Sequence, residues 1–162
     1  MHEHYMKQAL LEAEKAFEEE EIPVGAVIVY DNRIIARAHN QREMLKDPTA
    51  HAEMIAITQA AASLENWRLD GATIYVTLEP CLMCMGAILE SRIDALVFGT
   101  ADSKTKCRSV PDIKKIYDGS QKLDVTSNIL EQECKSILQG FFEDKRANPK
   151  KRYDVEALNL TP

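Results

Sequence analysis

The stretch ATIYVTLEPCLMCMGAILESRIDALVFG, residues 72–99, decides the fold that we expect for this chain. Residues 72–78 form a β-branched run of the buried type, and residues 93–99 form a second strand-like run. Between them, Pro80 opens a helical segment that extends to about Ser91. Two strands joined by a helix form a parallel βαβ unit, because a parallel partner is reached only through a long crossover. The sequence therefore predicts an α/β domain.

The segments that flank this unit complete the predicted sheet and its helices. Residues 24–38 are expected to form an antiparallel hairpin that turns at Asp31-Asn32, and residues 123–126 a short final strand. After a polar loop, Asp47-Pro48-Thr49 resembles a helix start, since proline is favoured in the first turn. Apolar residues at helical spacing predict helices over residues 3–20, 50–63 and 129–145.

Length and composition favour one domain. The chain has 162 residues, 45% of them hydrophobic, and we assign residues 1–145 to the domain and residues 146–162 to a C-terminal tail. No apolar stretch approaches the roughly 18 residues of a membrane span, and the residues at 1–4 do not resemble the start of a signal peptide. Four cysteines are too few for a secreted disulfide scaffold. The sequence thus predicts a cytoplasmic protein without membrane contact.

Two short motifs contain the residues that we expect to carry the chemistry, HAE at 51–53 and PCLMC at 80–84. Imidazole and thiolate are good zinc ligands, and a catalytic zinc site combines three protein ligands with one open position for water. Those three ligands would be His51, Cys81 and Cys84. Glu53 is then free to move protons between water and substrate, first as a base and then as an acid.

Two other interpretations of the cysteines stay open at this point. A structural zinc site needs a fourth protein ligand, for which the candidates are Cys107, His39 and Cys134. A redox-active CxxC pair after a strand is the second alternative, but it leaves the HAE motif unexplained. Cys134 lies on the apolar stripe of the last predicted helix, where the expected role is that of a small buried hydrophobe.

The arrangement of the two motifs resembles the HxE…PCxxC signature of zinc-dependent nucleobase deaminases. From about Tyr5 to Phe142 the chain is similar, more specifically, to the bacterial tRNA adenosine deaminases, the TadA family. The segments that carry this resemblance are IPVGAV at 22–27, HN at 39–40, DPTAHAEM at 47–54, WRLDGATIYVTLEPC at 67–81, SRI at 91–93 and FG at 98–99. Guanine deaminases of the same superfamily share HAE and EPCxMC, so YVTLEPC is the more discriminating segment.

The resemblance implies a three-layer α/β/α cytidine deaminase-like fold with a central mixed five-stranded sheet, assembled as a homodimer. The implied reaction is hydrolytic deamination of the wobble adenosine in a tRNA anticodon loop, which yields inosine and ammonia. A base in a single-stranded loop can be turned into a pocket at a small cost in stacking.

The resemblance also assigns roles to individual residues by motif. The ligands of one Zn²⁺ per chain would be His51, Cys81 and Cys84, and the catalytic residue would be Glu53. The substrate-binding residues would be Asn40, Asp102 and Lys104. An asparagine amide offers both a donor and an acceptor, which suits recognition of a purine.

Two competing functions fit parts of the sequence. A net charge of −6 and a pI near 5.3 argue against attraction to nucleic acid along the whole chain, and they favour deamination of a free purine base or nucleoside. Two groups of basic residues argue for nucleic acid, because they could contact the phosphates of an RNA strand. They are Lys104, Lys106 and Arg108, and a basic cluster over residues 145–152. The other competitor is a non-catalytic zinc or tRNA-binding module, and the presence of Glu53 argues against it.

Overall fold

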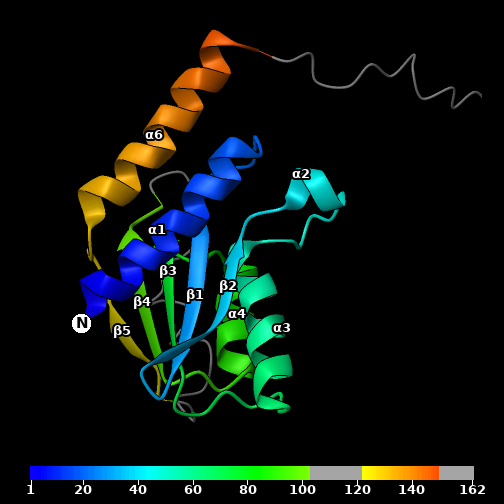
Figure 1. The fold of residues 1–162 in the computed structure, drawn as a ribbon, viewed down its shortest axis with the longest axis vertical. Helices are drawn as coiled ribbons and strands as arrows, with labels where there is room; N and C mark the ends of the chain where they lie inside the picture. The colour runs from blue at the N-terminus through cyan, green and yellow to red at the C-terminus, as the bar shows by residue number, and fades with distance from the viewer. Residues whose placement is uncertain (103–121, 150–162) are drawn as a thin grey trace, which may run out of the picture.

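The computed structural model describes residues 1–102 and 122–149, and Figure 1 shows the arrangement of its helices and strands. The strands are β1 (Gly25–Tyr30), β2 (Arg33–His39), β3 (Thr73–Leu78), β4 (Ala95–Thr100) and β5 (Asp124–Thr126). The helices are α1 (His2–Glu18), α2 (Arg42–Leu45), α3 (Ala52–Leu64), α4 (Leu82–Glu90) and α6 (Glu131–Ala147).

The strands form one mixed sheet in the order β2-β1-β3-β4-β5. β1 is antiparallel to both β2 and β3, whereas β4 runs parallel to β3 and β5 runs parallel to β4. In the β1–β2 hairpin, Asp31 and Asn32 have φ angles of 47° and 58°, the turn geometry that matches the twist of two paired strands. The predicted βαβ unit and the mixed five-stranded sheet are confirmed.

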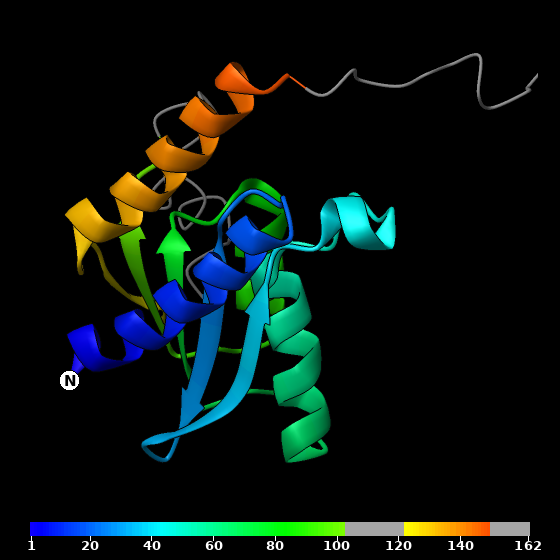
Figure 2. The same cartoon turned by 45° about the horizontal axis from the view of Figure 1, so that its top comes forward.

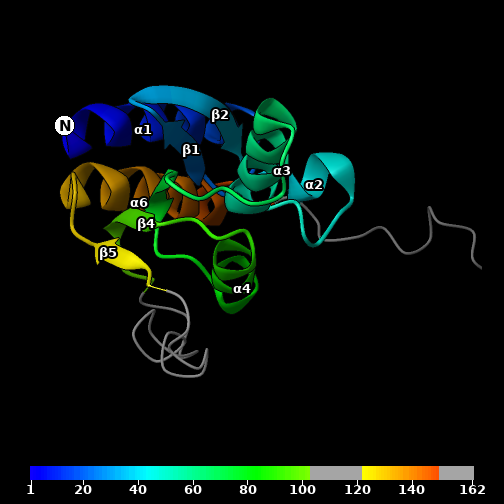
Figure 3. The same ribbon diagram turned by 90° about the horizontal axis from the view of Figure 1, so that it is seen from below.

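Helices cover both faces of the sheet, as Figure 3 shows in a view from below. On one face, α3 and α4 pack through side chains such as Ala56 and Ile88. On the other face, α1 and α6 contribute Met6 and Cys134 to a second apolar cluster. Because β1, β3 and β4 are covered on both sides, they have continuous apolar runs and not an alternation of apolar and polar residues. This is the expected three-layer α/β/α architecture.

The close packing of α1 on the sheet depends on Gly25, the first residue of β1. A Cβ atom at this position would collide with the backbone oxygen of Ala9 and the backbone nitrogen of Ala13. Both atoms belong to α1, which could retreat only by opening the layer between helix and sheet. The glycine in the IPVGAV segment is therefore required for the approach of a helix.

The topology of the sheet brings polar residues to one edge. The parallel strands β3 and β4 end at the paired residues Leu78 and Thr100. Glu79 and Asp102 follow these ends, and α4 begins just after β3. In open α/β sheets, ligands bind outside the carboxyl ends of parallel strands. A functional site is therefore expected at this edge of the sheet.

Two expectations about the segment before α3 are wrong. The helix begins at Ala52 and not at Asp47-Pro48-Thr49. The Asp47 carboxylate accepts hydrogen bonds from the backbone nitrogen and from the hydroxyl of Thr49, at 2.7 Å each, and this local bonding forms a turn in competition with a helix. In addition, residues 42–45 form the short helix α2, in the stretch where the sequence suggested a polar loop.

The last helix, α6, runs to Ala147, and residues 150–162 of the predicted tail lie outside the described residues. Lys104, Lys106, Cys107 and Arg108 also lie outside them. Within the described ranges, no helix is both long and apolar enough to cross a lipid bilayer.

Candidate metal and catalytic site

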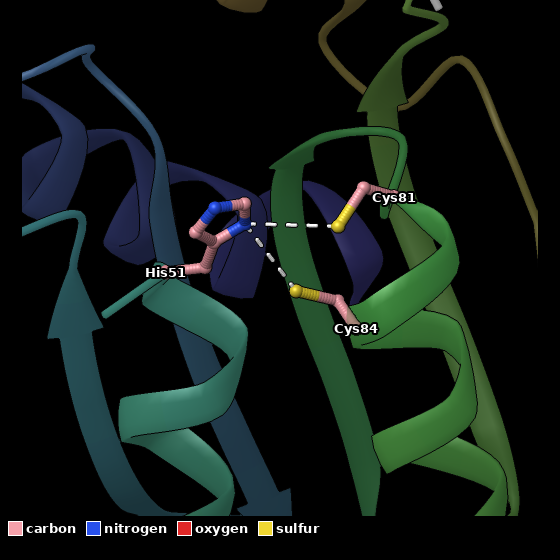
Figure 4. A group of neighbouring side chains, drawn as sticks. All are labelled: His51, Cys81 and Cys84. Carbon is pink, nitrogen blue, oxygen red and sulfur yellow. Dashed lines mark hydrogen bonds between the residues drawn. The ribbon is translucent and has the colours of Figure 1, made fainter. Parts of the chain in front are cut away.

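His51 and Cys81 occupy equivalent places in the fold, each directly before a helix. His51 is the N-cap of α3 and Cys81 is the N-cap of α4, and both have extended backbone angles. Cys84, in the first turn of α4, shares a helix face with Cys81, because residues three apart are neighbours on a helix. The starts of α3 and α4 lie opposite each other, so the three side chains point toward one another (Figure 4).

The three side chains are spaced as ligands of one metal ion. The Nδ1 atom of His51 lies 3.7 Å from the Sγ atom of Cys81 and 3.6 Å from the Sγ atom of Cys84. All three ligand atoms lie within 4.8 Å of one another. Tetrahedral zinc, with bonds of about 2.3 Å to sulfur and about 2.1 Å to nitrogen, requires nitrogen–sulfur separations of about 3.6 Å. The arrangement therefore fits a tetrahedral zinc ion.

Hydrogen bonds within this group decide which thiol is ionised. The hydrogen bond from the Cys84 thiol lowers the pKa of Cys81 to about 4, although burial acts in the opposite direction. The hydrogen bond to Cys81 raises the pKa of Cys84, and burial adds to this effect. The hydrogen bond with Cys81 also raises the pKa of His51. Without a metal ion, the group thus holds one thiolate and one thiol, and a metal that binds two thiolates must displace a proton.

Glu53 lies in the first turn of α3 and is only 4% exposed. Its carboxyl group lies close enough to Cys84 for the two groups to shift each other's pKa, and it is not one of the three grouped ligands. Burial raises the pKa of Glu53 to about 7, while its backbone hydrogen bond and the nearby His51 act in the opposite direction. A buried carboxyl group that lies beside the ligand group without belonging to it is placed to accept and deliver a proton, which is the requirement for a proton shuttle.

Asn40 follows β2 and has one polar atom without a partner. Its side-chain amide nitrogen donates a hydrogen bond to the carbonyl oxygen of Ile22 at 3.3 Å. Its backbone nitrogen donates to the carbonyl oxygen of Val24 at 3.0 Å. The Oδ1 atom of Asn40 is buried and has no hydrogen-bond partner within the described ranges. An unsatisfied buried acceptor costs about 1–3 kcal/mol, so this atom points to a ligand that donates to it.

A cavity of about 180 Å³ connects these residues. Its polar lining consists of Asn40, Arg42, His51, Glu53, Glu79, Cys81 and Asp102. Its apolar lining consists of Ile22, Val24 and Leu78. One small cavity therefore contains the predicted catalytic residue, two of the predicted ligands and two of the predicted substrate-binding residues. The third predicted substrate-binding residue, Lys104, lies outside the described residues.

Glu79 is a residue of this cavity that the sequence analysis did not single out. Its backbone nitrogen donates to the carbonyl oxygen of Thr100 at 2.8 Å, and its carboxylate accepts from the backbone nitrogen of Asp102 at 3.3 Å. Glu79 thus ties together the segments that follow β3 and β4. Its place directly after a buried parallel strand was the available signal. Arg42, which was also missed, gave no such signal because α2 was not predicted.

Two of the three candidates for a fourth protein ligand, His39 and Cys134, lie elsewhere, and the third, Cys107, lies outside the described residues. In His39, the Nε2 atom lies 2.9 Å from the Glu19 carboxylate and the Nδ1 atom lies 3.4 Å from the Glu12 carboxylate. Cys134 belongs to the apolar cluster on the opposite face of the sheet. In the part of the chain that the structure describes, the ligand group therefore has three members, the number found in catalytic and not in structural zinc sites.

Known proteins are similar to this chain in both sequence and fold. The sequence profile of the MafB19-like deaminase family matches residues 1–146. The tRNA-specific adenosine deaminase of Bacillus subtilis (strain 168) is 46% identical over 147 residues, which cover 90% of this chain and 91% of that protein. A solved structure from biochemical and structural studies of A-to-I editing by tRNA:A34 deaminases is 43% identical, with a TM-score of 0.76, and covers 83% of this chain and 99% of that chain.

A guanine deaminase from Nitrosomonas europaea matches with a TM-score of 0.75 at 20% identity, over 86% of this chain and 83% of that chain. At this identity the likeness concerns the fold alone.

Because the profile match extends over most of the chain and the fold is that of solved deaminases, this protein is a deaminase of the cytidine deaminase-like superfamily. The chain is more than 40% identical to both the Bacillus subtilis protein and the A34 deaminase structure. This identity is high enough to assign one family within the superfamily. The chain belongs to the family of tRNA-specific adenosine deaminases, as its sequence motifs predicted.

Proposed function

We propose that this protein converts adenosine to inosine at the wobble position of a tRNA anticodon loop and releases ammonia. The observation that carries this proposal is the buried carboxylate of Glu53, which lies against a three-member ligand group in a cavity. The unpartnered Oδ1 atom of Asn40 adds a recognition group for a substrate. Membership of the tRNA-specific adenosine deaminase family supports the choice of adenosine in tRNA.

One Zn²⁺ per chain would be held by His51, Cys81 and Cys84. When bound, the ion supplies a Lewis acid that makes a water molecule acidic enough to act as a nucleophile near neutral pH. Two thiolate ligands neutralise much of the charge of the ion, so a neighbouring base is needed for this activation. Glu53 is placed to be that base.

Glu53 would act twice in the reaction. It first takes one proton from the attacking water and delivers it to N1 of the purine, while the oxygen of the water bonds to C6. It then takes the remaining proton from that oxygen and delivers it to the exocyclic amino group. The bond between C6 and the amino nitrogen breaks, and ammonia leaves. One water is consumed, inosine is formed, and Glu53 returns to its starting state.

Three residues would bind the substrate. The Oδ1 atom of Asn40 would accept a hydrogen bond from the nucleoside, which satisfies an acceptor that is otherwise buried and unpartnered. Asp102 lines the same cavity, at a position where Glu79 binds its backbone nitrogen. The proposal for Lys104 rests on the family resemblance of the sequence alone.

We also propose that two chains associate as a homodimer. Met44, Leu45 and Leu82 are large apolar side chains that are more than half exposed, at 53%, 54% and 57%. Burial of such side chains in an interface would be favourable. Sedimentation equilibrium at micromolar concentration should give twice the mass of the chain, and a single-chain mass would contradict this assembly.

One comparison of substrates tests the proposed function. Zinc-loaded protein should form inosine in an anticodon stem-loop that contains a wobble adenosine. It should release little ammonia from adenine, guanine, adenosine, guanosine or cytidine. Reaction with free purines alone would contradict the tRNA assignment and support the competing free-purine function. The absence of any reaction from a zinc-loaded protein would support a non-catalytic module.

A further inference from the structure

Glu21 is a buried carboxylate that takes no part in the proposed chemistry. The residue is 1% exposed and follows α1. Its two oxygens accept hydrogen bonds from consecutive backbone nitrogens of α2, Oε1 from Met44 at 2.7 Å and Oε2 from Glu43 at 3.1 Å. Bonds of this charge-assisted kind compensate for the burial of a carboxylate. Glu21 thus attaches α2 to the body of the protein.

α2 depends on this attachment. The helix has four residues, none of them buried, and Figure 2 shows it standing away from β2 and α3. A single helical turn has no stability of its own in water. The hydrogen bonds to Glu21 therefore hold α2 in place, together with the hydrogen bond from the backbone nitrogen of its N-cap, Gln41, to the carbonyl oxygen of Ala50 at 3.0 Å.

Arg42 brings a positive charge to the cavity of the proposed active site. Arg42 contributes to the lining, as do the three acidic residues Glu53, Glu79 and Asp102, and its positive charge acts on His51 in the same lining. Arg42 is the one lysine or arginine among the described lining residues. Its guanidinium forms no ion pair within the described ranges. The guanidinium is therefore available to an anionic group of a ligand that enters the cavity.

We propose that Arg42 binds a phosphate group of the polynucleotide next to the nucleoside in the cavity, and that Glu21 is the positioning residue that holds Arg42 there. This inference rests on the proposed function. A planar guanidinium can donate two parallel hydrogen bonds to a phosphate. A free purine base carries no phosphate, so the contact favours a nucleoside within a strand. It also gives a protein with a net charge of −6 a local attraction for nucleic acid.

Arg42→Gln tests the contact, with Arg37→Gln as the matched control. Arg37 is exposed and lines a separate depression of about 390 Å³, which shares no lining residue with the cavity. On the anticodon stem-loop, Arg42→Gln should raise KM about tenfold or more with little change in kcat, as expected for the loss of one charge-assisted contact. It should also reduce the slope of log kcat/KM against log salt by about 0.7. Arg37→Gln should leave KM and the salt slope unchanged.

A neutral phosphate analogue identifies the group that Arg42 binds. Stem-loops with one methylphosphonate on the 5′ or the 3′ side of the target adenosine lack a single charge. With one of these substrates, the wild type should lose the same factor in KM that Arg42→Gln loses, and Arg42→Gln should lose nothing further. The inference would be overturned if the effects of the methylphosphonate and of Arg42→Gln on KM were additive. It would also be overturned if Arg42→Gln had the KM and the salt slope of the wild type.

Glu21→Gln tests the positioning role. This substitution keeps the size of the side chain but replaces one acceptor oxygen with a nitrogen that cannot accept a hydrogen bond from an amide. Glu21→Gln should raise KM and reduce the salt slope as Arg42→Gln does. Its zinc content and kcat should stay as in the wild type. A lower melting temperature with wild-type KM would overturn the role of Glu21. If wild-type protein forms no inosine in the stem-loop, the proposed function fails as well; if it does while Arg42→Gln behaves as the wild type, only this inference fails.

Discussion

The carboxyl group of Glu53 and the thiol of Cys84 lie close enough to shift each other's pKa, although the two residues lie on different helices, α3 and α4. This contact joins the proposed proton shuttle to the proposed metal ligands. A change at either position should therefore have effects on proton transfer and on metal binding that can be separated by measurement.

Glu53→Gln should abolish most of the activity and keep the metal. The amide preserves the volume of the side chain but cannot take a proton from water, so inosine formation should fall by about 100- to 10,000-fold. Metal analysis should still find one zinc per chain, because Glu53 is not one of the three grouped ligands. Glu14→Gln, at an exposed position of α1, is the control and should retain full activity. Turnover within tenfold of the wild type would reject Glu53 as the shuttle.

The stability of the metal-free protein should depend on pH through Glu53. Burial raises the pKa of this carboxyl from 4.5 to about 7, so the folded protein binds the proton more tightly than the unfolded chain. Its contribution to the free energy of unfolding is full below about pH 4.5 and is lost as the pH rises to about 7. Urea denaturation should show the wild type losing stability relative to Glu53→Gln across this window. Parallel pH profiles for the two metal-free proteins would contradict the raised pKa.

Zinc binding should release a proton from the ligand group. In the metal-free protein, the pKa of Cys81 is lowered to about 4 and the pKa of Cys84 is raised, so zinc must displace the proton of Cys84. Calorimetric titration at pH 8, in buffers that differ in ionisation enthalpy, should report release of at least one proton per zinc, with any proton held by His51 adding to that of Cys84. Cys84→Ser should bind zinc more weakly. Binding with no proton release in the wild type would show that both thiols are already ionised.

Asn40→Ala should weaken turnover more than folding. Loss of the hydrogen bond from the Oδ1 atom to the substrate should lower kcat/KM by about tenfold or more. The bond from the amide nitrogen to Ile22 is also lost, at a cost of about 1 kcal/mol, but removal of the buried, unpartnered Oδ1 atom offsets this cost, so the free energy of unfolding should change little. Asn66→Ala, at an exposed position outside the cavity lining, is the control and should keep kcat/KM. A wild-type kcat/KM in Asn40→Ala would remove Asn40 from the substrate-binding residues.

Two glycine substitutions should have opposite effects on stability. Gly25→Ala forces a Cβ atom into the backbone of α1 and should cost about 1–3 kcal/mol or more of the free energy of unfolding. Gly86→Ala lies within α4, where a Cβ atom meets no described atom within 4 Å, and it should be neutral or stabilise by up to about 1 kcal/mol. Denaturant titrations of both variants measure the difference. Equal stabilities would show that the approach of α1 to β1 is looser than the structure indicates.

Local patterns in the sequence were sufficient to predict the strands, the hairpin and the parallel βαβ unit, whereas the mixed five-stranded sheet followed from the family resemblance. The buried strands β3 and β4 are continuous apolar runs, and the helix between them is long enough to make the crossover that a parallel pair needs. The start of α3 was predicted too early because proline and threonine before it resemble a first helical turn. The Asp47 carboxylate instead forms a turn with Thr49, and that competition between local hydrogen bonds is not visible in hydrophobic periodicity.

The chemistry of the candidate site was already contained in residue types and spacing. An imidazole, two thiols three residues apart and a nearby carboxylate predict three zinc ligands and a base, because few other functions need this combination. Only the folded chain decides how these groups are placed. Packing of α3 and α4 on one face of the sheet brings the carboxylate of Glu53 against Cys84, and burial there raises its pKa. The contact between Glu21 and α2 likewise joins segments whose proximity no local pattern encodes, since hydrogen bonds between distant residues exist only after the chain has folded.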